Sequence, residues 1–210
     1  KVLGVYKIND DNLNLEQEKI LKKNLKKIIP KYDVVIVSDY GHGFLSGETA
    51  KQICKLSKFL ALNAQVNAAN IGYHSMRNYQ NTDCVIVNEK ELRHELRSKN
   101  EQIRILMKKL SKEQKIKNLI VTQGTQGSIL YNRIKNSFIH CDAYAKSAID
   151  KIGAGDTMLS IISLCLRSKF KSDVSLLVGS LAAAYSVQSM GNKNEINKIQ
   201  IIKSLETLLK

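Results

Sequence analysis

A short stretch in the last third of the chain has residue types suited to handling a phosphoryl group. It reads Gly153-Ala154-Gly155-Asp156 and leads into an apolar run, residues 158–166, that predicts a buried helix. A helix that begins at the glycines points its first backbone N–H groups outward, and such an end attracts anions. Asp156 at its mouth disfavours a bound phosphate but suits proton abstraction from an attacking hydroxyl. The alternative is a glycine-rich turn in which Asp156 caps a core helix.

The residues around this turn carry a family resemblance. Asp150-x-x-Gly153-Ala154-Gly155-Asp156-Thr157 resembles the signature of the PfkB/ribokinase family of sugar kinases. The resemblance implies that the amides of Gly153, Ala154 and Gly155 form an anion hole and that Asp156 is the base that activates a sugar hydroxyl. Lys151 and Ile152 depart from the Thr and the small residue or Val that the family usually has there, outside the Gly-Ala-Gly-Asp core.

A second motif follows the buried strand predicted for residues 84–87. Asn88 and Glu91 match the family's Asn-x-x-Glu pattern, which implies nucleotide binding and the ordering of magnesium-bound water and phosphate. Hard oxygen ligands with retained waters are what Mg²⁺ prefers. The alternative is a helix start with acidic residues in its first turn.

A third motif, Thr122-x-Gly124-x-x-Gly127, follows the strand predicted for residues 118–122. It resembles the family's Thr-x-Gly-x-x-Gly element, which implies that its backbone borders the phosphates and ribose of a nucleotide. The alternative is a glycine-rich hairpin turn.

Three polar residues are candidates for substrate binding. Asp39 opens Asp39-Tyr40-Gly41-His42-Gly43 after the strand predicted for residues 33–38, where open α/β sheets place ligands. It either contacts a sugar hydroxyl or a metal-bound phosphate, or is a turn residue before the next helix. Asn67 and Asn70 either hydrogen-bond a polyhydroxyl substrate or satisfy the loop backbone.

Alternating elements must position these residues. Hydrophobic periodicity and breakers predict helices at residues 15–29, 45–62 (capped by Ser46), 91–110 (one helix or a pair), 158–166, 173–190 and 197–209. Strands are expected at residues 1–6, 33–38, 84–87, 118–122, 129–131 and 137–140.

Such alternation implies a mostly parallel sheet flanked by helices. The motifs fall at strand ends in the family's order, so the resemblance implies an α/β, three-layer ribokinase-like fold. Residues 1–210 are expected to be a single PfkB-type kinase domain, its C-terminal, nucleotide-binding portion. The N-terminal segment that carries sugar contacts and a β lid in the family is expected to be largely absent.

The implied activity is transfer of the ATP γ-phosphoryl group to a sugar or sugar-phosphate hydroxyl, with ATP and Mg²⁺ as cofactors. The stretch 39–43 looks most like kinases of heptose 7-phosphate in ADP-heptose synthesis. The resemblance leaves open a homodimer and a nucleotidyltransferase domain or partner. A competing hypothesis is a non-catalytic nucleotide-binding or regulatory remnant of a sugar kinase.

Charge suggests another class of partner. Lys and Arg total 33 against 19 Asp and Glu, a net charge of +14, which suits nucleic acid or anionic metabolites. The lysines are scattered over amphipathic stretches such as residues 19–31 and 108–117, without aromatic residues interleaved for base stacking. We therefore expect no nucleic-acid partner, and a basic nucleic-acid-binding protein is the less favoured alternative.

The cysteines form no C-x-x-C pair and lie in apolar settings, which predicts reduced thiols in a cytoplasmic protein; they are Cys54, Cys84, Cys141 and Cys165. The longest apolar stretch, residues 174–190, is interrupted by serines and glutamine and predicts a core helix without membrane partners.

Overall fold

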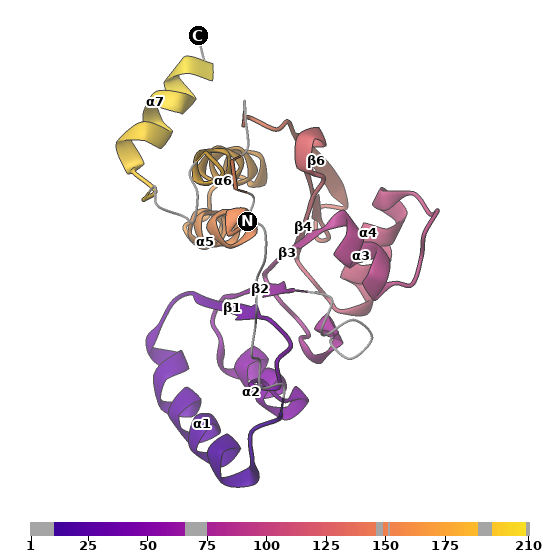
Figure 1. Ribbon diagram of the computed structural model, residues 1–210, viewed down its shortest axis with the longest axis vertical. Coiled ribbons are helices and arrows are strands. Elements are labelled where there is room, and N and C mark those ends of the chain that lie inside the picture. The colour runs from indigo at the N-terminus through magenta and orange to yellow at the C-terminus, as the bar shows by residue number, and fades with distance from the viewer. Residues whose placement is uncertain (1–10, 66–74, 146–148, 151, 189–194, 209–210) are drawn as a thin grey trace.

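The strands form one six-stranded sheet. The structure is a computed structural model that describes residues 11–65, 75–145, 149–150, 152–188 and 195–208. The sheet order is β1-β2-β3-β4-β5-β6 (Figure 1), with β1 to β4 parallel and β5 and β6 antiparallel. The strands are β1 Val35–Asp39, β2 Leu60–Ala64, β3 Cys84–Asn88, β4 Asn118–Thr122, β5 Ser128–Asn132 and β6 Ser137–Cys141.

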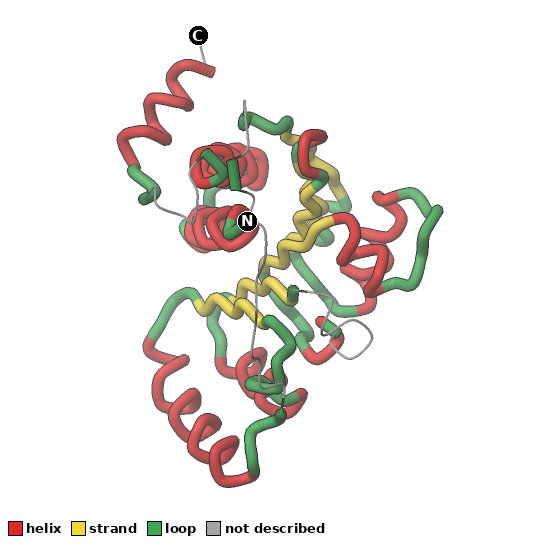
Figure 2. Tube along the Cα trace, in the orientation of Figure 1, coloured by secondary structure: helices red, strands yellow, loops and turns green. Residues whose placement is uncertain are grey.

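Helices cover both faces of this sheet. They are α1 Leu15–Ile28, α2 Gly47–Leu56, α3 Glu89–Glu95, α4 Ile103–Glu113, α5 Ala154–Arg167, α6 Ser172–Ser186 and α7 Lys198–Leu208, with 3-10 turns at Ile29–Lys31, Met76–Asn78 and Gly124–Gln126. The helices α2, α3 and α4 connect parallel strands in their spatial order, and right-handed crossovers place them on one face. The pair α5 and α6 lies on the opposite face (Figures 1 and 2).

The central strands are buried on both faces. Alternate side chains of a strand point to opposite sides. Val85 and Val87 therefore pack into the cluster beneath α2, α3 and α4, whereas Cys84 and Ile86 pack beneath α5 and α6. The expected α/β class, with a mostly parallel sheet between two helical layers, is confirmed.

The prediction of a single helix over residues 45–62 is wrong. Ser46 is the expected N-cap, but α2 ends at Leu56, where Ser57 adopts an extended backbone with φ −78° and ψ 131°. The apolar residues that follow form β2 instead. A short apolar run lacks the periodicity that separates a buried strand from a helix, and here the run pairs with β1 and β3. The stretch 91–110, left open as one helix or two, contains parts of two helices, α3 and α4.

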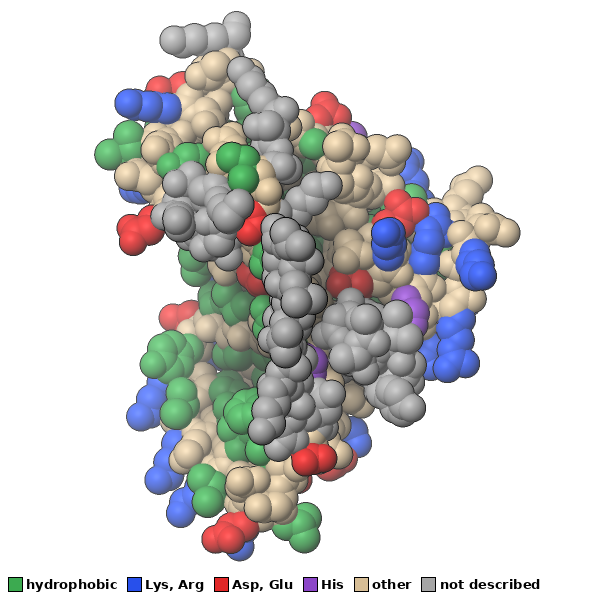
Figure 3. Space-filling model, in the orientation of Figure 1, with side chains coloured by type: hydrophobic (Ala, Val, Ile, Leu, Met, Phe, Trp, Pro, Cys, Tyr) green, Lys and Arg blue, Asp and Glu red, His purple; other side chains and the backbone are tan. Residues whose placement is uncertain are grey.

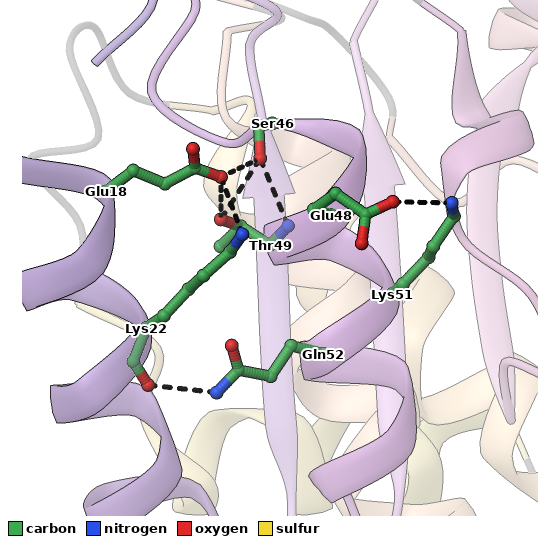
Figure 4. A network of polar contacts seen from close by, with 7 residues as sticks. All are labelled: Glu18, Lys22, Ser46, Glu48, Thr49, Lys51 and Gln52. Atoms are coloured by element: carbon green, nitrogen blue, oxygen red, sulfur yellow. Dashed lines mark hydrogen bonds and ion pairs between the residues drawn. The ribbon is translucent and has the colours of Figure 1, made fainter. Parts of the chain in front are cut away.

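Polar contacts attach α1 to α2 (Figure 4). Every residue of α1 is exposed or half-buried, so its packing contributes little apolar burial. Glu18 instead accepts hydrogen bonds from the hydroxyls of Ser46 and Thr49, the latter at 3.1 Å. Gln52 Nε2 donates to the Lys22 carbonyl at 2.9 Å. The same network orients the capped start of α2.

The helices and the surface of the described residues concern two partners that the sequence analysis does not expect, a membrane and a nucleic acid. Within the described ranges, each helix is too short or too polar to cross a bilayer. On the face in Figure 3, Lys and Arg side chains are spread over separate parts of the molecule, with acidic side chains among them.

Candidate active site

The predicted site residues come from strands whose carboxyl ends share one edge of the sheet. Asp39 ends β1, Asn88 ends β3 and Thr122 ends β4. In the parallel register Asn88 is the direct partner of Thr122, so the second and third motifs begin side by side.

The first motif opens α5 as expected. Gly153 is its N-cap in the left-handed conformation, with φ 82° and ψ −5°. The first backbone bond of the helical ladder runs from Thr157 N–H to Gly153 O at 2.9 Å. The N–H groups of Gly155 and Asp156 therefore precede that ladder, in the position from which helix ends bind anions.

Gly155 has no steric reason within the described chain to be glycine. Its φ lies outside the left-handed range, and a Cβ built on it meets no described atom within 4 Å. Alanine would be the better helix former in this first turn. A glycine that neither backbone conformation nor packing requires is typical of a place where a ligand approaches the main chain closely.

Asp156 is half-buried in the same turn and touches the end of β1. Its Oδ1 accepts a hydrogen bond at 3.0 Å from the Ser38 hydroxyl. Sequence reasoning missed Ser38. The available signal was its place as the penultimate residue of a strand that ends at the predicted ligand-binding edge.

Asp39 faces the other side of the sheet from Ser38. It is 8% exposed, and its carboxylate accepts from the Tyr79 hydroxyl at 2.6 Å and from Gly41 N–H at 3.0 Å. Burial, and then the hydrogen bond to Asp39, raise the pKa of Tyr79, so Tyr79 stays a proton donor. These contacts fit the alternative in which Asp39 is a turn residue before the next helix. Contact of Asp39 with a substrate stays a prediction.

Asn88 and Glu91 form a reciprocal cap at the start of α3. Asn88 Oδ1 accepts from Glu91 N–H at 2.8 Å, and Glu91 Oε2 accepts from Asn88 N–H at 2.8 Å. The helix-start alternative is thus realised. Asn88 and Glu91 supply amide and carboxylate oxygens of the kind that suit magnesium-bound water, and their contact with Mg²⁺ stays a prediction.

A polar bridge joins this helix to the third motif. Gln123 Nε2 donates to Glu89 Oε2 at 2.9 Å, and Arg93 contacts Glu89 Oε1 at 2.7 Å. The Gln123 amide and then Arg93 hold the pKa of the Glu89 carboxyl below its usual value. The loop after β4 is therefore fixed against the first turn of α3.

The third motif closes the β4–β5 hairpin. Gly124 and Gly127 have φ 61° and 83°. A Cβ at Gly127 would overlap the carbonyl oxygen of Cys141 on β6, so the fold itself requires this glycine. At Gly124 a Cβ meets no described atom within 4 Å, which leaves its backbone accessible. The hairpin alternative is realised, and contact of Thr122, Gly124 and Gly127 with a nucleotide stays a prediction.

Some predicted features lie outside the described residues. They are Asn67, Asn70, Lys151 and the strand expected at residues 1–6. Within the described ranges, no three His, Cys, Asp or Glu side chains gather as a metal site.

Comparisons with known proteins identify the family. Residues 6–199 match the family described as pfkB family carbohydrate kinase. The bifunctional protein HldE of Campylobacter curvus is 30% identical over 197 residues, which cover 91% of this chain and 40% of the relative.

Solved structures share the fold. Phosphofructokinase-2 from Escherichia coli superposes with a TM-score of 0.77 at 17% identity, covering 95% of this chain and 64% of that one. Arabidopsis thaliana ribokinase, complexed with ribose and ATP, gives 0.71 at 19% identity, covering 87% and 59%. The chain thus spans about two fifths of the curated relative and under two thirds of either solved kinase. The family match over residues 6–199 includes every motif of the candidate site, and the chain belongs to the pfkB family of carbohydrate kinases.

Proposed function

We propose that this chain transfers the γ-phosphoryl group of ATP to a hydroxyl of a sugar or sugar phosphate. The observation that carries the proposal is the first turn of α5. There a Cβ at Gly155 would meet no described atom within 4 Å, the backbone N–H groups precede the hydrogen-bonded ladder of the helix, and Asp156 lies beside them. Family membership supports phosphotransfer as the chemistry of this turn.

Each residue of the turn has a role in this mechanism. Asp156 takes the proton of the acceptor hydroxyl while the hydroxyl oxygen attacks the γ-phosphorus in line with the leaving group. The amides of Gly153, Ala154 and Gly155 stabilise the charge that develops on the transferring group, because fixed donors need no reorganisation during the reaction. Asp150 Oδ1 accepts from Ile152 N–H at 3.0 Å, and this contact shapes the entry to the turn.

The second and third motifs serve the nucleotide in this proposal. Thr122, Gly124 and Gly127 border the phosphates and ribose, and the polar bridge from Glu89 to Gln123 keeps their loop in register with α3. Asn88 and Glu91 would hold Mg²⁺ through water, and the bound ion would neutralise phosphate charge. The ATP in the Arabidopsis ribokinase structure supports the choice of nucleotide.

A heptose 7-phosphate-like acceptor is the substrate we propose. Asp39-Tyr40-Gly41-His42-Gly43 resembles the heptose 7-phosphate kinases, and a relative is named bifunctional protein HldE. Asp39, Asn67 and Asn70 are the proposed sugar contacts. We further propose that residues 1–210 are the C-terminal, nucleotide-binding portion of one PfkB-type kinase domain, which works with a second copy or with a nucleotidyltransferase domain or partner.

The test is ADP release from Mg-ATP with a panel of sugars and sugar phosphates that includes heptose 7-phosphate. Wild type is compared with Asp156→Asn, which removes the base, and with the matched control Asp173→Asn. Asp173 is an exposed acidic residue in the first turn of α6, so its substitution changes the charge at a helix start away from the site. We expect Asp156→Asn to lower turnover by roughly 100-fold or more and Asp173→Asn to leave it unchanged.

Two results would contradict the proposal in different ways. Absence of turnover with every acceptor, while Mg-ATP still raises the melting temperature, would favour a nucleotide-binding or regulatory module. Absence of both turnover and nucleotide binding would refute the nucleotide site itself.

A further inference from the structure

We infer that Ser38 is a positioning residue for Asp156, so that the Asp39 segment serves the reaction through the residue before its aspartate. This inference rests on the proposed function, in which Asp156 is the base. The contact is the 3.0 Å hydrogen bond from Ser38 Oγ to Asp156 Oδ1. It joins residues 118 positions apart and is the point where the end of β1 meets the first turn of α5.

The pleat of β1 decides which residue reaches the base. Successive side chains of a strand point to opposite faces. Val37 and Asp39 are buried, Val37 in the cluster beneath α2, whereas Ile36 and Ser38 are exposed. The helix α5 lies on the face of Ser38, so that residue meets Asp156 while Asp39 turns to Tyr79.

Ser38 lies in a part of the sheet where hydrogen bonds join neighbouring strands. In the β1–β2 register it is paired with Asn63, whose side chain donates to the Ile86 carbonyl of β3 at 2.9 Å. Three strands are thereby joined at the level of Ser38. A hydroxyl fixed in this way can hold one carboxylate oxygen by a charge-assisted hydrogen bond.

The two carboxylate oxygens of Asp156 have different surroundings. Oδ1 is held by Ser38, whereas Oδ2 makes no hydrogen bond to any described residue. Oδ2 is then the oxygen that accepts the proton of the acceptor hydroxyl. Orientation of a base matters for rate because a misplacement of about 1 Å can cost about 100-fold.

A purely structural role for the contact makes a different prediction. The far end of α5 is also attached near β1, since Arg167 donates to the Asp33 carbonyl at 3.2 Å and to its carboxylate at 3.3 Å. If Ser38 merely attached the helix to the sheet, loss of the Ser38 contact or of the Arg167 contact would lower the free energy of unfolding. Turnover per folded molecule would then be the same in both variants as in the wild type. Arg167→Ala is therefore the matched control.

The experiment measures kcat and KM separately for Ser38→Ala, Ser38→Thr and Arg167→Ala, using the acceptor that the wild type uses best. We expect Ser38→Ala to lower kcat by about 10- to 100-fold with little change in either KM. Ser38→Thr keeps a hydroxyl on a residue that suits a strand and should restore most of the rate. Arg167→Ala should keep the wild-type kcat.

The contact is also measured without turnover. In urea unfolding, Ser38→Ala and Asp156→Ala should shift the midpoint less in combination than the sum of their separate shifts, because each removes one partner of the same hydrogen bond. Additive shifts would overturn the contact.

Kinetics distinguish the positioning role of Ser38 from the proposed function. An active wild type with an unchanged kcat in Ser38→Ala, or with an equal loss in Arg167→Ala, overturns the positioning role and leaves the proposed function standing. A raised acceptor KM at unchanged kcat would make Ser38 a substrate contact instead. An inactive wild type refutes the proposed function, and the positioning role falls with it.

Discussion

Gly155→Ala separates folding from function at the first turn of α5. The residue lies inside the helix, its φ is outside the left-handed range, and an added Cβ meets no described atom within 4 Å. The substitution should therefore fold normally. If a transferring phosphoryl group approaches this backbone, the same methyl group intrudes on it, and turnover should fall.

The two expected effects have opposite signs. Alanine favours a helix over glycine by about 1 kcal/mol in helix interiors, so the free energy of unfolding should stay constant or rise by up to about that amount. Removal of one donor from an oxyanion hole typically lowers kcat by about 100- to 1000-fold. We expect a loss of that order, because the methyl group separates the amide from the phosphoryl oxygen.

Two other glycines provide controls. Gly127→Ala should cost roughly 3 kcal/mol or more, because φ 83° with ψ −136° suits glycine alone and a Cβ overlaps the Cys141 carbonyl. Gly124→Ala, with φ 61° and no described atom within 4 Å of its Cβ, should cost only about 1–2 kcal/mol. Urea unfolding at pH 7 measures all three variants, and ADP release measures turnover. Full turnover by a stable Gly155→Ala variant would refute the role of this backbone as an anion hole. A large loss of stability in the same variant would refute the reasoning that a Cβ fits at position 155.

Two further predictions concern the contacts that hold the site. Glu89→Gln should lower the free energy of unfolding at pH 7 by up to about 1 kcal/mol, since its ion pair with Arg93 is partly exposed. The folded-state pKa of Glu89 is lowered, so its contribution is present above the usual glutamate value near 4.3 and is lost as pH falls through the lower folded value; a difference between variant and wild type that does not shrink as pH falls below the usual glutamate value would contradict this. Tyr79→Phe should cost about 2–3 kcal/mol, because the buried Asp39 side chain loses a hydrogen-bond donor, whereas Tyr131→Phe, whose hydrogen bond to the Asn136 side chain is only partly buried, should cost about 1 kcal/mol; equal losses in the two variants would contradict a stronger hydrogen bond at Asp39.

The strands could be predicted from sequence wherever polar or turn-forming residues mark their ends. β3 and β4 are short runs rich in Val and Ile that end at polar residues, and both lie where the sequence analysis predicts strands. β2 was missed because its apolar residues follow α2 after three residues and merge with the helical pattern. Its assignment depends on pairing with β1 and β3, which is tertiary information.

The site motifs were found for a related reason, and their limits are also physical. A short motif with glycine constrains the backbone locally, so the left-handed Gly153 and the start of α5 follow from the residues themselves. The same reasoning cannot say whether a glycine is required by packing or by a ligand. A Cβ at Gly127 meets the backbone of β6, whereas a Cβ at Gly155 meets no described atom within 4 Å, and only the folded arrangement distinguishes the two glycines.

The pair Ser38 and Asp39 shows how one position along a strand changes a function. Sequence reasoning selected the carboxylate, since a charged residue at the end of a strand is the stronger chemical signal. The pleat sends that carboxylate to Tyr79 and sends the hydroxyl to Asp156. Which face α5 would cover depends on the chain path after β6, more than 100 residues later in the sequence. The strand ending Ser-Asp thus supplies a structural anchor on one face and a contact with the proposed base on the other. Exchange of the two residues should therefore disrupt both, with loss of the Tyr79 contact and of the Asp156 contact in one variant.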